Sequence, residues 1–145
     1  ILGGPASNSV LNDLLRERNG WVYGVEASYT QYSESGILAI SLGCDRSNLE
    51  KCLKETFRAI GRLQDTPLSE RKLNAAKKQL LGQLAISSDN GATQCLSMGK
   101  SLLSFGTVFS DGENVAAIEN VSAEQLRSIT CEILAPERMS SLIYL

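Results

Sequence analysis

The stretch RERNGWVYGVEASY, residues 16–29, contains the change of pattern that decides the fold. Before it, apolar residues recur at helical spacing, and Asn8 or Ser9 is placed to cap the first turn. Gly20 can adopt the left-handed conformation that ends many helices. After Gly20 the apolar period changes to two, which is typical of a strand. The stretch therefore predicts a helix that ends near residue 19 and a strand that starts at Trp21. The apolar positions of the helix are Val10, Leu11, Leu14 and Leu15.

The predicted strand has two faces, and a second strand follows it. Alternation puts one set of side chains on a shared face: Trp21, Tyr23, Val25, Ala27 and Tyr29. After a polar turn over residues 30–36, the run ILAISLG at 37–43 has the β-branched and apolar content of a strand. A β-hairpin is the simplest arrangement of these two runs.

The rest of the chain predicts several amphipathic helices. Ser47 with Glu50, and Ser122 with Gln125, have the spacing of a capping box. Further helices are expected between the break DTPLSE at 65–70 and the interruption SSDNGATQ at 87–94, then around 95–103 and 112–120. A last helix is expected from Ser122 to about Leu134, and Pro136 ends it. The closing run RMSSLIYL at 138–145 suits a final strand. The expected apolar stripe of the first long helix is Leu49, Cys52, Leu53, Thr56, Phe57, Ile60 and Leu63. That of the next is Leu73, Ala76, Leu80, Leu81 and Leu84.

This order of elements predicts an α+β fold in which helices cover one face of an antiparallel sheet. No long polar linker or internal repeat divides residues 1–145, so we expect a single domain. Three strands are few for this much amphipathic helix, and Ile1 follows no methionine. We therefore expect the later part of a larger repeat, without its first strand and helix.

Composition excludes several classes of function. A net charge of −2 over 145 residues gives no electrostatic footprint for nucleic acid or an anionic membrane. The four cysteines form no CxxC pair and, with no histidine in the chain, make a zinc site of their own improbable. Their spacing favours free thiols over a disulfide scaffold, although an even number leaves bridges open. We expect a cytoplasmic or periplasmic protein, with a slight preference for a reducing compartment.

Arg16 and Tyr23 form the candidate catalytic pair. A helix end and a strand start, joined by a short turn, can aim a guanidinium and a phenol at one point. Both groups donate hydrogen bonds and one is always charged, so the pair suits a developing oxyanion. The alternative is structural, because an arginine at a helix end usually interacts with the helix dipole and a strand tyrosine usually packs.

Four segments resemble the C-terminal repeat of the pitrilysin/insulinase zinc peptidases. They are ILGG at 1–4, the run from NSVLNDLL to ISLGCD at 8–45, LSERKLNAAKKQLLGQLAIS at 68–87 and IENVSAEQLRSI at 118–129. The resemblance implies the fold of mitochondrial processing peptidase and of LuxS-like metallohydrolases. It covers nearly the whole chain, and Arg16 to Tyr23 is its most specific part.

The resemblance also implies a division of labour between two halves. In this family an HxxEH helix holds zinc and supplies a glutamate base, and it belongs to an N-terminal domain or subunit. The C-terminal half binds no cofactor and contributes an arginine and a tyrosine, here aligned with Arg16 and Tyr23. This chain would then be the half of a zinc endopeptidase that binds substrate and stabilises the transition state, and it would be inactive alone.

The glycine loop is a second candidate region. Gly3, Gly4 and Asn8 are expected to touch peptide substrate, because glycine permits close backbone approach, although a simple turn explains the loop as well. The chain departs from the family pattern here: the arginine usual after the loop serine is Val10, and the small pair before the tyrosine is Trp21 and Val22. These departures leave the substrate contacts of the loop open.

Two other functions remain open. Members of the same superfamily serve as structural subunits of respiratory complexes, so this chain can be an assembly subunit without chemistry. An unrelated ligand-binding α+β domain is the third alternative. The expected partners are the HxxEH half and a peptide, and a homodimer of the fragment is a weaker expectation that follows from exposed apolar surface.

Overall fold

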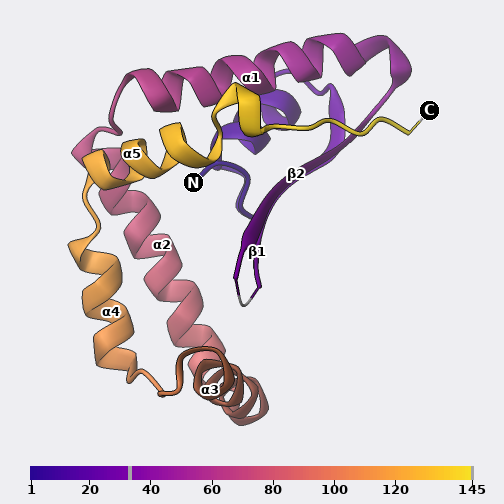
Figure 1. Ribbon diagram of the computed structural model, residues 1–145. Helices are drawn as coiled ribbons and strands as arrows, with labels where there is room; N and C mark the ends of the chain where they lie inside the picture. The colour runs from indigo at the N-terminus through magenta and orange to yellow at the C-terminus, as the bar shows by residue number, and fades with distance from the viewer. Residues whose placement is uncertain (33, 145) are drawn as a thin grey trace. The chain divides into compact units, whose positions relative to one another are not determined.

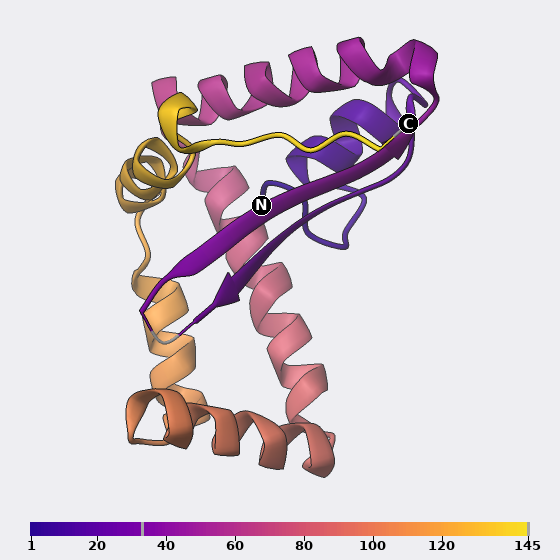
Figure 2. The same ribbon diagram turned by 45° about the vertical axis from the view of Figure 1, so that its right-hand side comes forward.

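The computed structural model describes residues 1–32 and 34–144, and two compact units are found within it. The first unit comprises residues 1–67 and 127–145, and the second comprises residues 68–126. Each unit is described by itself below (Figures 1 and 2). The expectation of one domain over residues 1–145 stays a prediction.

The first unit begins with a short helix and a β-hairpin, as the sequence predicts. The helical segment is η1, Asn12–Glu17, and it is a π-helix in place of the expected α-helix. Strand β1, Val22–Gln31, pairs antiparallel with β2, Gly36–Cys44, in a two-stranded sheet (Figure 1). Between η1 and β1, Gly20 has φ 61°, which is the left-handed conformation predicted for it.

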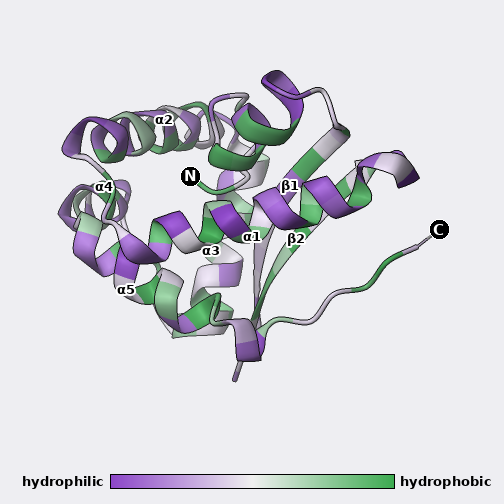
Figure 3. Ribbon diagram, turned by 90° about the horizontal axis from the view of Figure 1, so that it is seen from above, coloured by the Kyte–Doolittle hydropathy of each residue, from purple (hydrophilic) through white to green (hydrophobic). Residues whose placement is uncertain are grey.

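Helix α1, Leu49–Asp65, packs against the same face of the hairpin as η1. The shared core consists of Leu11, Leu15, Val22, Val25, Cys52 and Ala59. Figure 3 shows the alternation of apolar and polar residues along α1. Half-buried side chains of β2 at every second position complete this face, whereas Tyr29 and Ile37 are more than half exposed. The predicted arrangement of helices on one face of an antiparallel sheet is confirmed.

The predicted stripe of α1 is only partly correct. Ala59 is buried although the stripe omits it, and Phe57 is 45% exposed although the stripe includes it. The core needs small residues where the helix lies close to the hairpin, and an alanine fits there better than a phenylalanine.

The end of the first unit differs from the prediction. The chain returns to the first unit at Arg127, within helix α5, Ala123–Ile133. The 3-10 turn η3, Pro136–Arg138, follows and leads into an extended segment that pairs with neither strand. The predicted strand at 138–145 is therefore wrong over residues 138–144, and Leu145 lies outside the described residues. Apolar, β-branched content favours a strand, but a strand also needs an edge to pair with.

The second unit consists mainly of three helices. They are α2, Glu70–Ser88, α3, Gly91–Phe105, and α4, Asp111–Asn120. All three match predicted helical segments. Leu73 is the one hydrophobic residue of this unit that is buried within the described range, and α3 has no buried residue. Leu80 and Leu84, expected to face inward, are 44% and 39% exposed.

Two sequence motifs with the spacing of a capping box have different outcomes in the structure. Ser122 and Gln125 form the predicted capping box: each backbone N–H donates to the other side chain, at 2.7 and 3.1 Å. Ser47 and Glu50 form none, because a 3-10 turn, η2 at Arg46–Asn48, moves the start of α1 to Leu49. Neither Asn8 nor Ser9 caps η1, since the Ser9 hydroxyl instead donates to the Gly4 carbonyl at 3.1 Å.

Candidate functional site

Arg16 lies on a π-helix, a rare element that often occurs at functional sites. The wide turn is closed by the Arg18 N–H, which donates to the Asp13 carbonyl five residues earlier at 3.0 Å. Leu11 and Leu15 hold the segment, because both are fully buried. Arg16 itself is exposed, and its guanidinium has no hydrogen bond or ion pair to another described residue. Its five donors are therefore available to a ligand.

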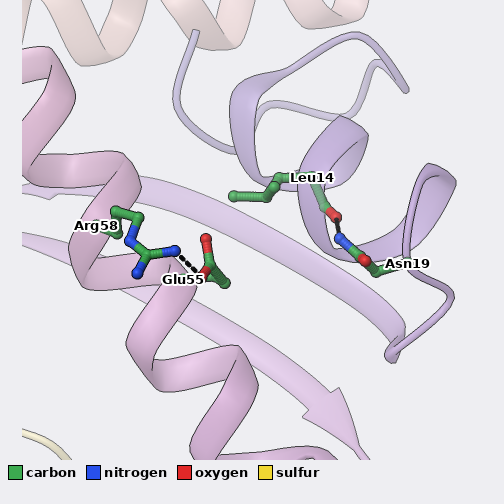
Figure 4. Close-up of polar contacts among 4 residues, drawn as sticks. All are labelled: Leu14, Asn19, Glu55 and Arg58. Carbon is green, nitrogen blue, oxygen red and sulfur yellow. Dashed lines mark hydrogen bonds and ion pairs between the residues drawn. The ribbon is translucent and has the colours of Figure 1, made fainter.

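The end of η1 is fixed by contacts of its own side chains. The Asn19 side-chain amide donates to the Leu14 carbonyl at 2.7 Å (Figure 4), and the Gly20 N–H donates to the Arg16 carbonyl at 2.9 Å. Arg18 pairs with Asp13 at 2.6 Å. Of the two arginines in this turn, one is thus engaged within the helix and Arg16 is not.

Tyr23 lies at an irregularity of the hairpin. Val22 pairs with Cys44 and Gly24 with Gly43, so Tyr23 is the extra residue of a β-bulge. The bulge breaks the predicted alternation: Val22 and Val25 are buried, and Tyr23 is 72% exposed. The expectation that Trp21, Tyr23 and Val25 share one face is therefore wrong, because two residues on β1 oppose one on β2.

Two contacts hold the exposed Tyr23 side chain. A Cβ placed on Gly43 would lie 3.9 Å from Tyr23 Cδ2, so the ring lies across the neighbouring strand at a glycine. The Tyr23 hydroxyl donates to Asp45 Oδ1 at 2.6 Å. This hydrogen bond raises the pKa of Tyr23, and the negative charge of Asp45 adds to the effect. The phenol is therefore a weaker acid here than in water.

Arg16 and Tyr23 come from adjoining elements, but no hydrogen bond joins their side chains among the described contacts. The Trp21 N–H donates to the Leu15 carbonyl at 2.9 Å and ties the start of β1 to η1. Each residue sits on a local irregularity, a π-turn for Arg16 and a bulge for Tyr23, and such irregularities often re-aim a side chain at a functional site. The arrangement presents one unengaged cationic donor and one phenol bound to a carboxylate.

The glycine loop packs against β1. Gly3 is buried, and its carbonyl accepts from the Ala27 N–H at 2.7 Å. A Cβ on Gly3 would lie 2.8 Å from the Ala27 nitrogen, so close packing accounts for this glycine. Gly4 has open space around its Cβ position, and its carbonyl accepts from the side chains of Ser9 and Asn12. Asn8 is exposed. The substrate contacts expected for these three residues stay a prediction.

The described part of the chain offers no fitting site for zinc. It contains no histidine, and no group of three or more cysteine or acidic side chains gathers within residues 1–32 and 34–144. The cysteines are free thiols; Cys52 is fully buried, and burial raises the pKa of its thiol to about 11. A thiol that stays protonated is a poor metal ligand at neutral pH. None of the helices that the structure describes is long and apolar enough to cross a membrane.

A family model described as the peptidase M16 inactive domain matches residues 1–80. These residues are more than half of the chain and include Arg16, Tyr23 and Asp45. The chain therefore belongs to the peptidase M16 family, as a domain of the inactive type. The resemblance to pitrilysin/insulinase peptidases is confirmed, and an inactive domain is in accord with the lack of a zinc site in these residues.

Curated relatives are similar over nearly the whole chain. An uncharacterized zinc protease of Rickettsia felis is 26% identical over 143 residues, which are 99% of this chain and 34% of that protein. The uncharacterized zinc protease YmxG of Bacillus subtilis is 23% identical over 143 residues, or 99% of this chain and 35% of YmxG. The chain thus spans about a third of the length of these relatives.

Solved structures show the same fold. A conserved protein from Enterococcus faecalis V583 matches with TM-score 0.78 and 20% identity, over 90% of this chain and 30% of that one. A peptidase M16 inactive domain from Pseudomonas fluorescens matches with TM-score 0.76 and 22% identity, over 91% and 31%. A chain of complex III2 from Candida albicans matches with TM-score 0.74 and 18% identity, over 90% and 31%. The α+β fold of the M16 C-terminal domain is thereby confirmed.

Sequence reasoning missed two features of the site. Asp45 lies at the end of a segment that resembles the family and carries no motif of its own. In a hairpin of this register, however, a carboxylate directly after β2 lies near the start of β1. The π-turn at Arg16 gives no signal in the apolar pattern, because residues 10, 11, 14 and 15 suit an α-helix equally well.

Proposed function

We propose that this domain is the half of an M16 zinc endopeptidase that binds substrate and stabilises the transition state. Arg16 and Tyr23 would donate to the carbonyl oxygen of the scissile peptide as negative charge develops on it. The zinc of a separate HxxEH half would activate the attacking water. The chain would then be inactive alone, and its partners would be that half and a peptide.

The observation that carries this proposal is the unengaged guanidinium of Arg16 on a π-turn directly before the bulge that bears Tyr23. Arg18, in the same turn, pairs with Asp13, whereas Arg16 keeps its charged side chain exposed to a ligand. A purely structural tyrosine would be expected to bury its ring, whereas Tyr23 is 72% exposed. Both residues also lie within the part of the chain that the family model matches.

The test uses the full-length protein together with its zinc half and a set of internally quenched fluorescent peptides. Arg16→Ala and Tyr23→Phe should each lower kcat by roughly 10² to 10³, the usual effect of losing one oxyanion donor. Arg18→Ala is the matched control, because it removes an arginine from the same turn and should change kcat less than about twofold. Unchanged turnover in both Arg16→Ala and Tyr23→Phe would contradict the catalytic role.

A second candidate function is an assembly subunit without chemistry. The fold likeness to a chain of complex III2 supports it, since that structure is of a multisubunit assembly. The same variants separate the two candidates: an assembly role predicts normal incorporation into the complex and no peptidase activity to lose. Retention of Arg16 and Tyr23 together favours the peptidase.

A further inference from the structure

The hydrogen bond between Tyr23 and Asp45 limits what the phenol can do. Asp45 is an exposed carboxylate, and its Oδ1 accepts the hydrogen bond, so the single proton of the Tyr23 hydroxyl is the one that lies between the two oxygens. While this bond lasts, Tyr23 has no proton left to donate to a substrate carbonyl. Its oxygen can accept hydrogen bonds only.

The negative charge of Asp45 makes it harder for Tyr23 to donate to a substrate carbonyl. A hydrogen bond to an ionised acceptor is roughly twice as strong as one between neutral groups. The carboxylate would also repel negative charge that develops on a carbonyl oxygen beside the phenol. The first effect favours the bond to Asp45 over a bond to a neutral carbonyl oxygen, and the second disfavours negative charge on an oxygen placed beside the phenol.

The register of the hairpin places Tyr23 and Asp45 close enough to form this hydrogen bond. Tyr23 is the extra residue of the bulge, and Asp45 follows Cys44, the partner of Val22 in the ladder. The ring lies across Gly43 and the hydroxyl reaches one residue beyond Cys44. Arg16, in contrast, has no such competitor among the residues described. Of the two proposed donors, Tyr23 is therefore already hydrogen-bonded and Arg16 is not.

We propose that Asp45 is a positioning residue that holds Tyr23 in a competing hydrogen bond, which must exchange before Tyr23 donates to a peptide carbonyl. The inference rests on the proposed function of Tyr23. No bond other than hydrogen bonds changes in the exchange. Arg16 donates to the carbonyl oxygen without any such exchange. At Tyr23, the exchange takes place as negative charge rises on the carbonyl oxygen.

The decisive variant is Asp45→Asn in the full-length protein with its zinc half. Asparagine keeps the size and an acceptor oxygen but removes the charge, so the competing bond weakens while the ring keeps its place. We expect kcat/KM for the quenched peptides to rise on the order of fivefold, from the difference between charged and neutral hydrogen bonds. In a Tyr23→Phe background the same substitution should have no effect, since the competition needs the hydroxyl.

Asp65→Asn is the matched control, because it removes one exposed carboxylate from the end of α1, away from any contact with Tyr23 in the described structure. It should leave kcat/KM within about twofold. A loss of turnover in Asp45→Asn, or an equal gain in the Tyr23→Phe background, would overturn the competition.

A spectroscopic titration tests the bond without relying on activity. In protein labelled with 13C at tyrosine Cζ, the Tyr23 signal is assigned by its absence from Tyr23→Phe. Its midpoint should move to lower pH in Asp45→Asn and stay in place in Asp65→Asn; Asp45 and Cys44 are the titrating groups that act on it. An unmoved midpoint in Asp45→Asn overturns the hydrogen bond. Unchanged turnover in Tyr23→Phe, with a moved midpoint, instead overturns the catalytic role of Tyr23 and leaves the bond standing.

Discussion

Gly3 and Gly4 are adjacent and alike in the sequence, but their surroundings differ. A Cβ on Gly3 would lie 2.8 Å from the Ala27 nitrogen and 2.9 Å from its Cβ, whereas nothing lies within 4 Å of a Cβ on Gly4. The first contact is with strand backbone, which has little room to move. At the residue scale, close packing on β1 therefore decides which glycine is required.

Substitution of the two glycines tests this difference. Gly3→Ala should lower the free energy of unfolding by about 1–3 kcal/mol, as expected for an overpacked site. Gly4→Ala, the matched control, should change it by less than about 0.5 kcal/mol. Urea unfolding followed by circular dichroism gives both values. Equal losses in the two variants would show that the loop does not pack on β1 as described.

At the scale of elements, one motif occurs twice with different outcomes. Ser47-x-x-Glu50 and Ser122-x-x-Gln125 have the same spacing, but the capping box is formed by Ser122 and Gln125 alone of these two. A third box, Ser110 with Glu113, precedes α4, and the hydrogen bonds that Glu113 accepts from Ser110 lower the pKa of its carboxyl. The motif marks a candidate helix start, and the conformation of the preceding backbone decides whether the two capping hydrogen bonds form.

Alanine substitutions at Ser122 and Ser47 measure how much each serine contributes to the free energy of unfolding. Ser122→Ala removes the acceptor of the Gln125 N–H and should cost about 0.5–2 kcal/mol of stability. Ser47→Ala is the control, since Ser47 is exposed and caps no helix, and its effect should stay within about 0.5 kcal/mol. Thermal or urea unfolding gives the comparison. A loss at Ser47 as large as that at Ser122 would contradict the assigned caps.

At the scale of the whole molecule, burial is unevenly divided between the two units. The first unit contains eight of the nine buried hydrophobic residues found in the described range, and the second contains Leu73 alone. Large side chains of α3 are strongly exposed, among them Leu96 at 67% and Leu103 at 89%. Local stability follows buried apolar contact, so the second unit should open more readily than the first.

Hydrogen exchange on the 1–145 chain tests this expectation. Backbone amides in the middle of α3 should exchange much faster than those in the middle of α1, because α1 places Cys52, Ala59 and Ile60 in the core and α3 buries no side chain. Mass spectrometry of peptides from the two helices gives the rates. Equal protection of α1 and α3 would contradict the proposed difference in local stability.

Much of the architecture follows from the sequence pattern. The change from helical to alternating apolar spacing at Gly20, the hairpin and the long helices were all predictable, because local propensity and burial agree there. The strand expected at 138–144 failed because pairing depends on a partner edge, which propensity does not supply. The pair Arg16 and Tyr23 was predicted from donor chemistry and family resemblance. Asp45 was missed because its contact with Tyr23 links positions 22 residues apart.

The sequence by itself determined the α+β class, the helix–hairpin–helices order up to the last helix, the absence of histidine ligands and membership of a peptidase family in its inactive domain. These properties depend on residue type and short-range spacing, which are visible in one chain. The tertiary structure decided that Arg16 has no side-chain partner among the described residues while Arg18 pairs with Asp13. It also decided that a bulge turns Tyr23 outward and that Asp45 accepts the hydrogen bond of the Tyr23 hydroxyl. These depend on register and on side-chain contacts across the hairpin, because one extra residue in a strand reverses the faces of those before it.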